Sequence, residues 1–186
     1  MITGGKHELQ PAITPEAICG AFSERQEELR WLAAFLTGDD GVGEACVLDA
    51  CACMQKSCNG GADGLTESPA FATVNSAIQV QQSRIAELAP VYANRVCSGR
   101  TDEKLAAESL EFIVLESDVI RSRLDTICRF VLVICGIEKR APTEAASWLS
   151  ISRSAVEAAY CAAIESLEVI DCQRQIESDP GSTAWN

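Results

Sequence analysis

The chain has 186 residues, enough for one medium-sized domain or two small ones, and 47% of them are apolar while only 5% are aromatic. A core of small aliphatic side chains suits closely packed helices, and no window shows the alternation of a half-buried strand, so the sequence predicts an all-α fold. The net charge is −12: residues 1–110 carry 8 basic and 15 acidic side chains (−7), and residues 111–186 carry 7 and 12 (−5). Neither half therefore has the basic character of a protein that binds duplex DNA tightly on its own.

The N-terminal residues and the longest apolar run indicate the compartment. The opening residues MITGGKHELQPAIT lack the apolar segment of a signal peptide. The run FVLVICGI, at 130–137, is far shorter than a membrane-spanning helix. We therefore expect a cytoplasmic protein without a membrane partner, whose ten cysteines are reduced thiols.

In the first half of the chain, helix signals follow a loose tail. Thr14 followed by Pro15 is typical of a helix start, with threonine as the N-cap and proline at the first helical position. Apolar residues then recur at helical spacing as far as Gly38, and two further helices follow, the second interrupted near Pro90. The expected elements are a tail at 1–13 and helices at 14–38, 42–58 and about 68–90, the helices forming a domain at 14–97.

The second half begins with a linker and contains shorter helices. The helical pattern weakens around CSGRTDEK, and Thr101 or Asp102 then caps a helix. Pro142 and Ser152 mark the starts of two later helices. The expected elements are a linker at 98–110, helices at 119–135, 142–149 and 152–170, and a polar tail at 173–186, with a second domain at 111–172.

The stretch TEAASWLSISRSAVEAAY has the spacing of a helix-turn-helix, in which two helices cross so closely that small and apolar residues must stand at fixed positions. Ala146, Ser150 and Val156 stand at relative positions 0, 4 and 10. Ile151 would fill the turn and Ser152 would cap the second helix, while Ser150 takes the place usually given to glycine. Helices of an ordinary bundle can show the same spacing, so that alternative stays open.

The wider segment RLDTICRFVLVICGIEKRAPTEAASWLSISRSAVEAAYCAAIESL resembles region 4 of sigma-70-type RNA polymerase sigma factors, most closely the extracytoplasmic-function group. The residues that carry this resemblance are Glu144-Ala145-Ala146, Leu149, Ile151-Ser152 and Val156. Upstream, LRWLAAFLTGDDGVGEACVLDACACM is similar in layout to sigma region 2, through Leu36-Thr37-Gly38-Asp39 and Glu44. The resemblance implies two small helical domains, the second a helix-turn-helix of the sigma region 4 type.

By this resemblance the protein would bind promoter DNA and recruit RNA polymerase core for transcription initiation. An anti-sigma or other regulatory protein would be a further partner. The implied DNA contacts lie at the start of the recognition helix and just before the motif, and they are Ser152, Arg153, Ser154, Lys139 and Arg140. The implied polymerase contact is Glu44.

Several positions depart from the family pattern. Where the family usually has Lys or Arg after the valine of the recognition helix, this chain has Glu157, Ala158 and Ala159, and a carboxylate that faces phosphate is repulsive. The usual tryptophan and basic cluster of region 2 are missing from PAFATVNSAIQVQQSRIAEL, which offers only Arg84. The alternative is therefore a degenerate sigma-derived protein-interaction or regulatory module with little DNA binding.

Four cysteines, Cys46, Cys51, Cys53 and Cys58, form the pattern C-x4-C-x-C-x4-C in one expected helix. A single helix cannot present all four to one tetrahedral metal ion, and the spacing differs from that of zinc and plant-type iron–sulfur sites. We expect these cysteines to act as small apolar residues and to hold no metal. A thiol-based redox sensor is the alternative.

The sequence offers little for catalysis. His7, the only histidine, lies in the expected tail, and the chain shows neither a phosphate-binding glycine-rich loop nor a nucleophile elbow. A stripe of Arg121, Arg123 and Arg129 would be basic, but pairing with acidic residues on the same helix is the favoured interpretation. We expect no enzymatic activity, no catalytic residue and no cofactor.

Overall fold

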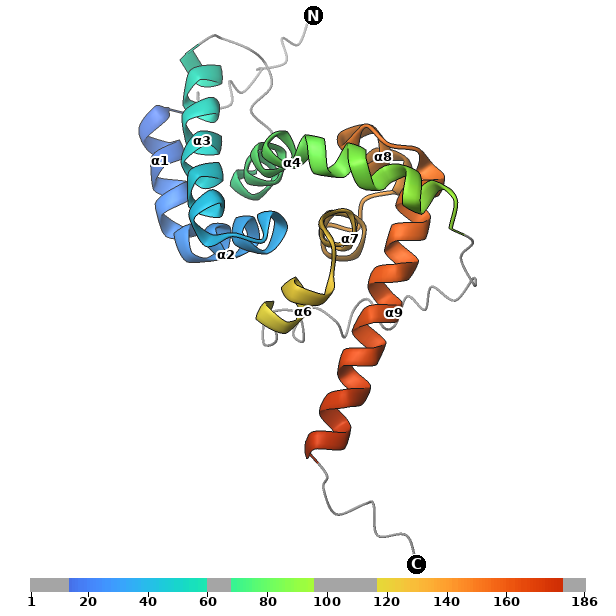
Figure 1. Cartoon of the computed structure of the whole chain (residues 1–186). Coiled ribbons are helices and arrows are strands. Elements are labelled where there is room, and N and C mark those ends of the chain that lie inside the picture. Colours follow the sequence, from blue (N-terminus) through green and yellow to red (C-terminus); the bar gives the residue numbers. More distant parts are fainter. Residues whose placement is uncertain (1–13, 60–67, 96–116, 179–186) are drawn as a thin grey trace, which may run out of the picture.

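The computed structural model describes residues 14–59, 68–95 and 117–178, and their secondary structure is entirely helical, which confirms the all-α prediction for this part of the chain (Figure 1). The helices are α1 (Pro15–Glu24), α2 (Gln26–Thr37), α3 (Asp40–Asn59), α4 (Pro69–Ala93), α6 (Ser117–Arg123), α7 (Thr126–Val131), the π-helical segment η1 (Leu132–Ile137), α8 (Pro142–Leu149) and α9 (Arg153–Ser178). Within these ranges no helix has both the length and the apolar character needed to span a membrane. Four features predicted from the sequence lie outside the described residues: the tail at 1–13 with His7, the linker at 98–110, the helix expected from Thr101 or Asp102, and residues 179–186 of the C-terminal tail.

The helix expected at 14–38 is two helices, so the prediction of one continuous helix is wrong. Thr14 caps α1 as predicted, because its hydroxyl accepts the N–H of Ala17 at 3.2 Å. The chain leaves helical geometry at Arg25 (φ −114°, ψ 18°), where the sequence has neither glycine nor proline. The break lets α1 pack along α3 and bury Phe22 in the core. Tertiary packing thus overrides the local helical pattern.

Helix α4 continues through Pro90 to Ala93, so the predicted interruption is wrong. Proline has no N–H and therefore removes one backbone hydrogen bond, to the carbonyl of Ala86. Both Pro90 and Ala86 are exposed, and solvent can satisfy that carbonyl. At its full length α4 reaches from α2 and α3 to α8 and α9.

Asp125 divides the helix expected at 119–135 into α6 and α7. Its carboxylate accepts the N–H of Cys128 at 3.0 Å and so caps α7. Beyond α7 the backbone widens into η1, which ends after Gly136 rather than before it. The prediction of one helix is wrong because the surrounding apolar periodicity conceals an N-cap in the middle of the pattern.

The last two helices begin where the sequence predicts. Pro142 occupies the first position of α8, which ends at Leu149, and α9 begins directly after Ser152. The end of α9 differs, because the helix continues to Ser178, beyond the expected end near Ile170. The first part of the predicted polar tail is therefore helical.

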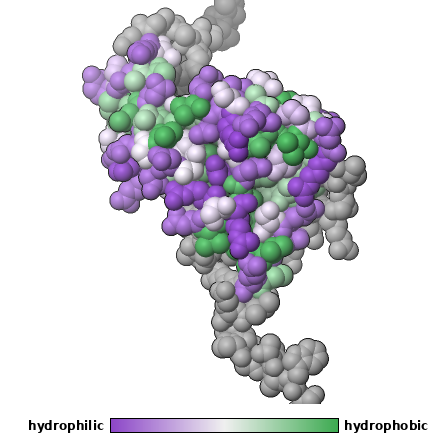
Figure 2. All heavy atoms as spheres, viewed as in Figure 1, coloured by the Kyte–Doolittle hydropathy of each residue, from purple (hydrophilic) through white to green (hydrophobic). Residues whose placement is uncertain are grey.

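Helix α4 lies between two groups of helices, α1–α3 on one side and α6–α9 on the other (Figure 1). The buried side chains of both groups belong to one continuous hydrophobic cluster. The division of the chain into domains at 14–97 and 111–172 stays a prediction. On the face drawn in Figure 2, apolar atoms of the described residues lie in small patches separated by polar ones, as is usual for a protein surface.

Candidate nucleic-acid interface

The turn between α8 and α9 is where the sequence predicts a DNA-reading motif. Ser150 adopts the left-handed conformation (φ 55°, ψ 40°), and the N–H of Ile151 donates to the carbonyl of Ala146 at 3.1 Å, which closes the end of α8. Ala146 and Val156 are buried, as their spacing predicts, and Ile151 packs half-buried against the core. The local geometry is that of two helices joined by a tight turn.

The start of α9 is exposed and capped by Ser152, as predicted. The Ser152 hydroxyl accepts the N–H of Ala155 at 3.2 Å and lies 3.0 Å from the hydroxyl of Ser154. Arg153 and Ser154 are exposed beside it. The first N–H groups of a long helix, together with its dipole, favour one anionic group at this point.

Both arginines that the sequence predicts to contact DNA have a carboxylate one helical turn away. Arg153 Nε lies 2.7 Å from the carboxylate of Glu157, further along α9. Arg140 lies 3.9 Å from the carboxylate of Glu144, and its guanidinium stacks over the ring of Trp148, 5.7 Å from the ring centroid. These pairs join positions i and i+4, the spacing at which helical side chains meet.

The exposed charges around this turn cancel. Three cations, Lys139, Arg140 and Arg153, are matched in number by three carboxylates, Glu138, Glu144 and Glu157, and all six residues are exposed. Exposed ion pairs are weak, so they do not lock the arginines in place. What they remove is the net positive charge that attracts a phosphate backbone.

Between Ala158 and Ile164 every side chain of α9 is buried or half-buried, and exposed side chains return from Glu165 onward. Ala158, Cys161 and Ala162 are only 2%, 8% and 5% exposed, and α4 and α7 both pack against α9 (Figure 1). A recognition helix in the major groove contacts the base edges mainly with residues of its N-terminal part. The surface that α9 offers near the turn is therefore small.

Glu44, the predicted polymerase contact, lies near the start of α3. Its carboxylate is 3.5 Å from Arg30 of α2, and the two side chains are 49% and 48% exposed. Gly43 allows the two helices to approach closely, since a Cβ at this position would lie 2.6 Å from the backbone nitrogen of Ala34. Glu44 is thus accessible to a partner and is held only by a weak surface pair.

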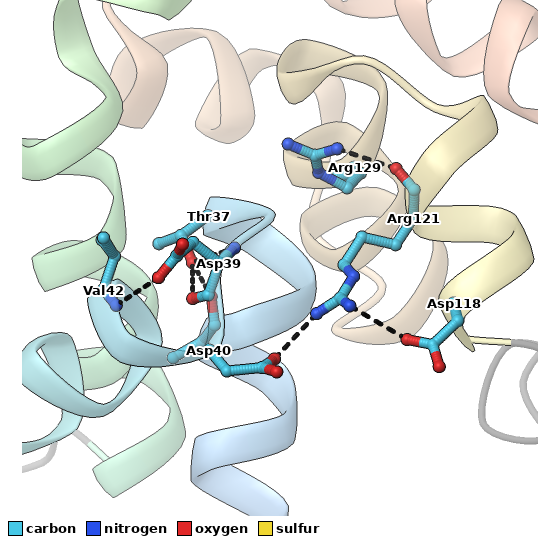
Figure 3. Close-up of polar contacts among 8 residues, drawn as sticks. Thr37, Asp39, Asp40, Val42, Asp118, Arg121 and Arg129 are labelled. Atoms are coloured by element: carbon cyan, nitrogen blue, oxygen red, sulfur yellow. Dashed lines mark hydrogen bonds and ion pairs between the residues drawn. The ribbon is translucent and has the colours of Figure 1, made fainter.

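Residues 36–39, the LTGD segment, comprise the last two residues of α2 and the turn into α3 (Figure 3). Gly38 is left-handed (φ 81°) and ends α2. The Asp39 carboxylate accepts the N–H of Val42 at 2.9 Å at the start of α3. Thr37 is buried, and its hydroxyl lies 2.8 Å from the carbonyl oxygen of Ala33. Each residue of the segment therefore has a structural role in the turn.

Arg121 reaches this turn from α6. Its guanidinium lies between two carboxylates, 2.8 Å from Asp40 and 3.0 Å from Asp118 (Figure 3). The pair with Asp118 is the same-helix interaction that the sequence favours. The pair with Asp40 connects the two groups of helices at their surface.

Arg129 is the residue whose role the sequence did not reveal. It is 8% exposed, so it belongs to no surface stripe. Its guanidinium donates to the carbonyl oxygens of Leu36 at 3.4 Å, Arg121 at 3.0 Å and Leu124 at 2.8 Å. Burial lowers the pKa of Arg129, while the nearby Asp125 carboxylate opposes this shift and helix-end carbonyls accept its hydrogen bonds. The one available signal is a single arginine inside the apolar run TICRFVLVI.

Buried Tyr92 and Cys128 and half-buried Asp125 form a polar cluster that borders a cavity of about 400 Å³ between α4, α7 and α9. The Tyr92 hydroxyl lies 2.5 Å from the Asp125 carboxylate and 3.1 Å from the Cys128 sulfur. Burial raises the pKa of Tyr92, and it raises that of Cys128 to about 12. Both groups thus stay protonated at neutral pH, and Cys128 lacks the thiolate character of a nucleophile.

The four cysteines of α3 differ in their surroundings. Cys46 is buried, Cys51 and Cys58 are half-buried, and Cys53 is exposed. Burial raises the pKa of Cys46, as expected for a cysteine that packs as an apolar residue. In the part of the chain that the structure describes, no three His, Cys, Asp or Glu side chains come together as a metal site would require.

No protein-family model matches the chain, and no curated protein or solved structure matches it either. The function proposed below is therefore argued from the geometry of the site and the sequence resemblance. That geometry is an exposed, capped helix start with balanced charges, on a helix whose residues 158–164 are buried or half-buried against its neighbours.

Proposed function

We propose that this protein is a sigma-like regulatory module that acts through protein contacts and has little affinity for DNA. The observation that carries the proposal is the charge balance at the starts of α8 and α9, where Arg140 pairs with Glu144 and Arg153 with Glu157. Duplex binding draws most of its non-specific affinity from cations that neutralise phosphates. The packing of α4 and α7 on α9 supports the same conclusion.

RNA polymerase core is the protein partner that the resemblance implies. Glu44 matches a position of sigma region 2, is half-exposed, and has Arg30 beside it. The LTGD turn just before it is held rigidly by its own hydrogen bonds and by Arg129. A half-exposed ion pair on a rigid helix start is suited to exchange partners with charged groups of another protein.

A promoter-binding sigma factor is the second candidate. It is favoured by the exposure of Ser152, Arg153 and Ser154 at the N-terminus of a 26-residue helix. These groups and the first N–H groups of α9 would hold one phosphate, and Lys139 would add a second contact. The α8–turn–α9 unit would then serve as a helix-turn-helix.

Binding to purified RNA polymerase core and to promoter DNA, each measured separately, tests the proposal. We expect the full chain to bind core and not to bind DNA. Glu44→Lys should weaken core binding by about tenfold, the usual scale for a lost interfacial charge contact. Glu27→Lys, an equal charge change at an exposed site of α2, is the control. Absence of core binding would overturn the proposal, and salt-sensitive DNA binding would favour the sigma factor.

A further inference from the structure

Two cysteines on different helices meet at the surface between α1 and α3. Cys19 lies in α1 and is exposed, while Cys51 lies in α3 and is half-buried. The two helices run side by side and are in contact (Figure 1). The pair is separate from the α8–α9 turn and from Glu44.

The contact with Gln55 shows which face of α3 the Cys19 thiol of α1 lies against. The side-chain amide of Gln55 donates to the Cys19 sulfur. Gln55 follows Cys51 by one helical turn, so both residues lie on the same face of α3. The Cys51 thiol lies close enough to the Cys19 thiol for that neighbour to help raise its pKa. Two thiols from separate helices thus lie close together on the face of α3 that Gln55 marks, at a site that solvent reaches.

The surroundings of the pair favour a redox role over a metal role. No third His, Cys, Asp or Glu joins the pair into a metal site among the residues that the structure describes. Cys53, only two residues from Cys51, contacts Asp49 on another face of α3 and is exposed. It therefore supplies a matched control, an accessible thiol on the same helix that faces away from α1.

We propose that Cys19 and Cys51 are a reversible oxidation site, forming an intramolecular disulfide when the protein meets hydrogen peroxide. The Cys19 thiolate attacks one peroxide oxygen, which breaks the O–O bond and, after proton transfer, gives a sulfenic acid and one water. The Cys51 thiolate then attacks that sulfur, forming the S–S bond and releasing a second water. In total, two thiols are oxidised by two electrons and one peroxide is reduced to two waters.

Cys19 is the first thiol to react because it is the more exposed. Burial, with the neighbouring Cys19 thiol, raises the pKa of Cys51, so Cys51 holds less thiolate and reacts second, in a step that its nearness to Cys19 makes intramolecular. The bond joins α1 covalently to α3, the helix that carries Glu44. It closes a loop in the unfolded chain, so the oxidised protein should melt at a higher temperature than the reduced protein.

Peptide mapping of the full chain after peroxide treatment, without reduction, tests this assignment. Cys46, Cys51 and Cys53 lie on one tryptic peptide, between Arg30 and Lys56, so substitutions identify the partner. We expect a cross-link from the Cys19 peptide to this peptide that dithiothreitol reverses. It should be absent in Cys51→Ser and retained in Cys53→Ser.

Differential alkylation of the wild-type protein checks the result without any variant. Cys19 and Cys51 should lose reactivity together on oxidation, while exposed Cys53 and Cys172 remain reactive. A cross-link that persists in Cys51→Ser would overturn the assignment. Conversion of Cys19 to a sulfinic acid while Cys51 stays alkylatable would overturn it too.

Discussion

The turns before α3 and before α9 are built from the same local elements. Each places a left-handed residue after a helix, Gly38 (φ 81°) in the first and Ser150 (φ 55°) in the second. Each then caps the next helix with a side-chain oxygen. The Asp39 carboxylate accepts the N–H of Val42, and the Ser152 hydroxyl accepts the N–H of Ala155. On local geometry alone the two turns are equivalent.

They differ in what surrounds them. The first turn packs against Arg129, whose guanidinium binds the carbonyl of Leu36 and connects α2 to α6 and α7. The second presents its capped helix start to solvent among balanced charges. Residues 38–40 of the first turn are exposed as well, so the two turns differ in the buried arginine that binds the first and the balanced charges that surround the second. The function of such a turn therefore has to be judged from the residues around it and not from its own geometry.

The largest effect is expected at the buried arginine. Arg129→Met keeps the apolar stem but leaves the carbonyls of Leu36, Arg121 and Leu124 without their donor, which should cost about 3 kcal/mol of unfolding free energy. Urea denaturation measures this. Arg121→Met, at a partly exposed ion pair, is the control and should cost less than about 1 kcal/mol. Equal losses of unfolding free energy in both variants would show that Arg129 does not stabilise the contact of α2 with α6 and α7 more than a surface ion pair does.

Substituting the left-handed residues should change stability in opposite directions. Gly38→Ala strains the backbone and places a Cβ 3.1 Å from Nη2 of Arg129, so we expect a loss of about 1 to 2 kcal/mol. Ser150→Gly relieves the same strain in an open turn and should add about 0.5 to 1 kcal/mol. Thermal and urea unfolding of the two variants give the sign of each change in unfolding free energy directly. A gain for Gly38→Ala would refute the crowding by Arg129.

Removing either cap should cost a similar amount. Asp39→Ala and Ser152→Ala each leave one N–H at a helix start without its side-chain acceptor, at about 1 kcal/mol. Their urea midpoints should therefore shift alike. Ser154→Ala, which removes a neighbouring hydroxyl that caps no described N–H, is the control and should leave stability nearly unchanged. A loss in Ser154→Ala as large as in Ser152→Ala would argue against the assigned cap.

The last effect, which is absent at neutral pH, is a dependence on alkaline pH. Burial raises the pKa of Cys128 to about 12 and that of Cys135 to about 11, from an ordinary value of 9.0. Below pH 9 these thiols are protonated in both states and stability is unaffected. As pH rises further, the unfolded chain loses these protons first and stability falls. Cys128→Ala should reduce this slope in urea unfolding, whereas Cys172→Ala, at an exposed site, should not.

Local signals account for the elements that were predicted correctly. Pro142 and Ser152 identify the starts of α8 and α9, and the i,i+4 spacing of Arg153 and Glu157 is visible in the sequence. The breaks at Arg25 and Asp125 were missed because the apolar periodicity continues across them.

The parts of the candidate site that could not be predicted depend on long-range contacts. Arg129 binds a carbonyl 93 residues away, a partner that no spacing indicates. The contact between Cys19 and the α3 face of Gln55 likewise depends on how α1 folds back. The coverage of α9 by α4 depends on packing between distant segments as well.

Fluorescence anisotropy of a labelled duplex, titrated at two salt concentrations, tests the central claim most directly. The wild type should show no saturable binding up to about 10⁻⁴ M, whereas Glu144→Lys with Glu157→Lys should bind in a salt-sensitive manner. Glu16→Lys with Glu24→Lys on α1 adds the same charge away from α9 and should not reproduce that gain. Salt-sensitive wild-type binding tighter than about 10⁻⁶ M would contradict the account, because charge balance would then not prevent this helix from reading DNA.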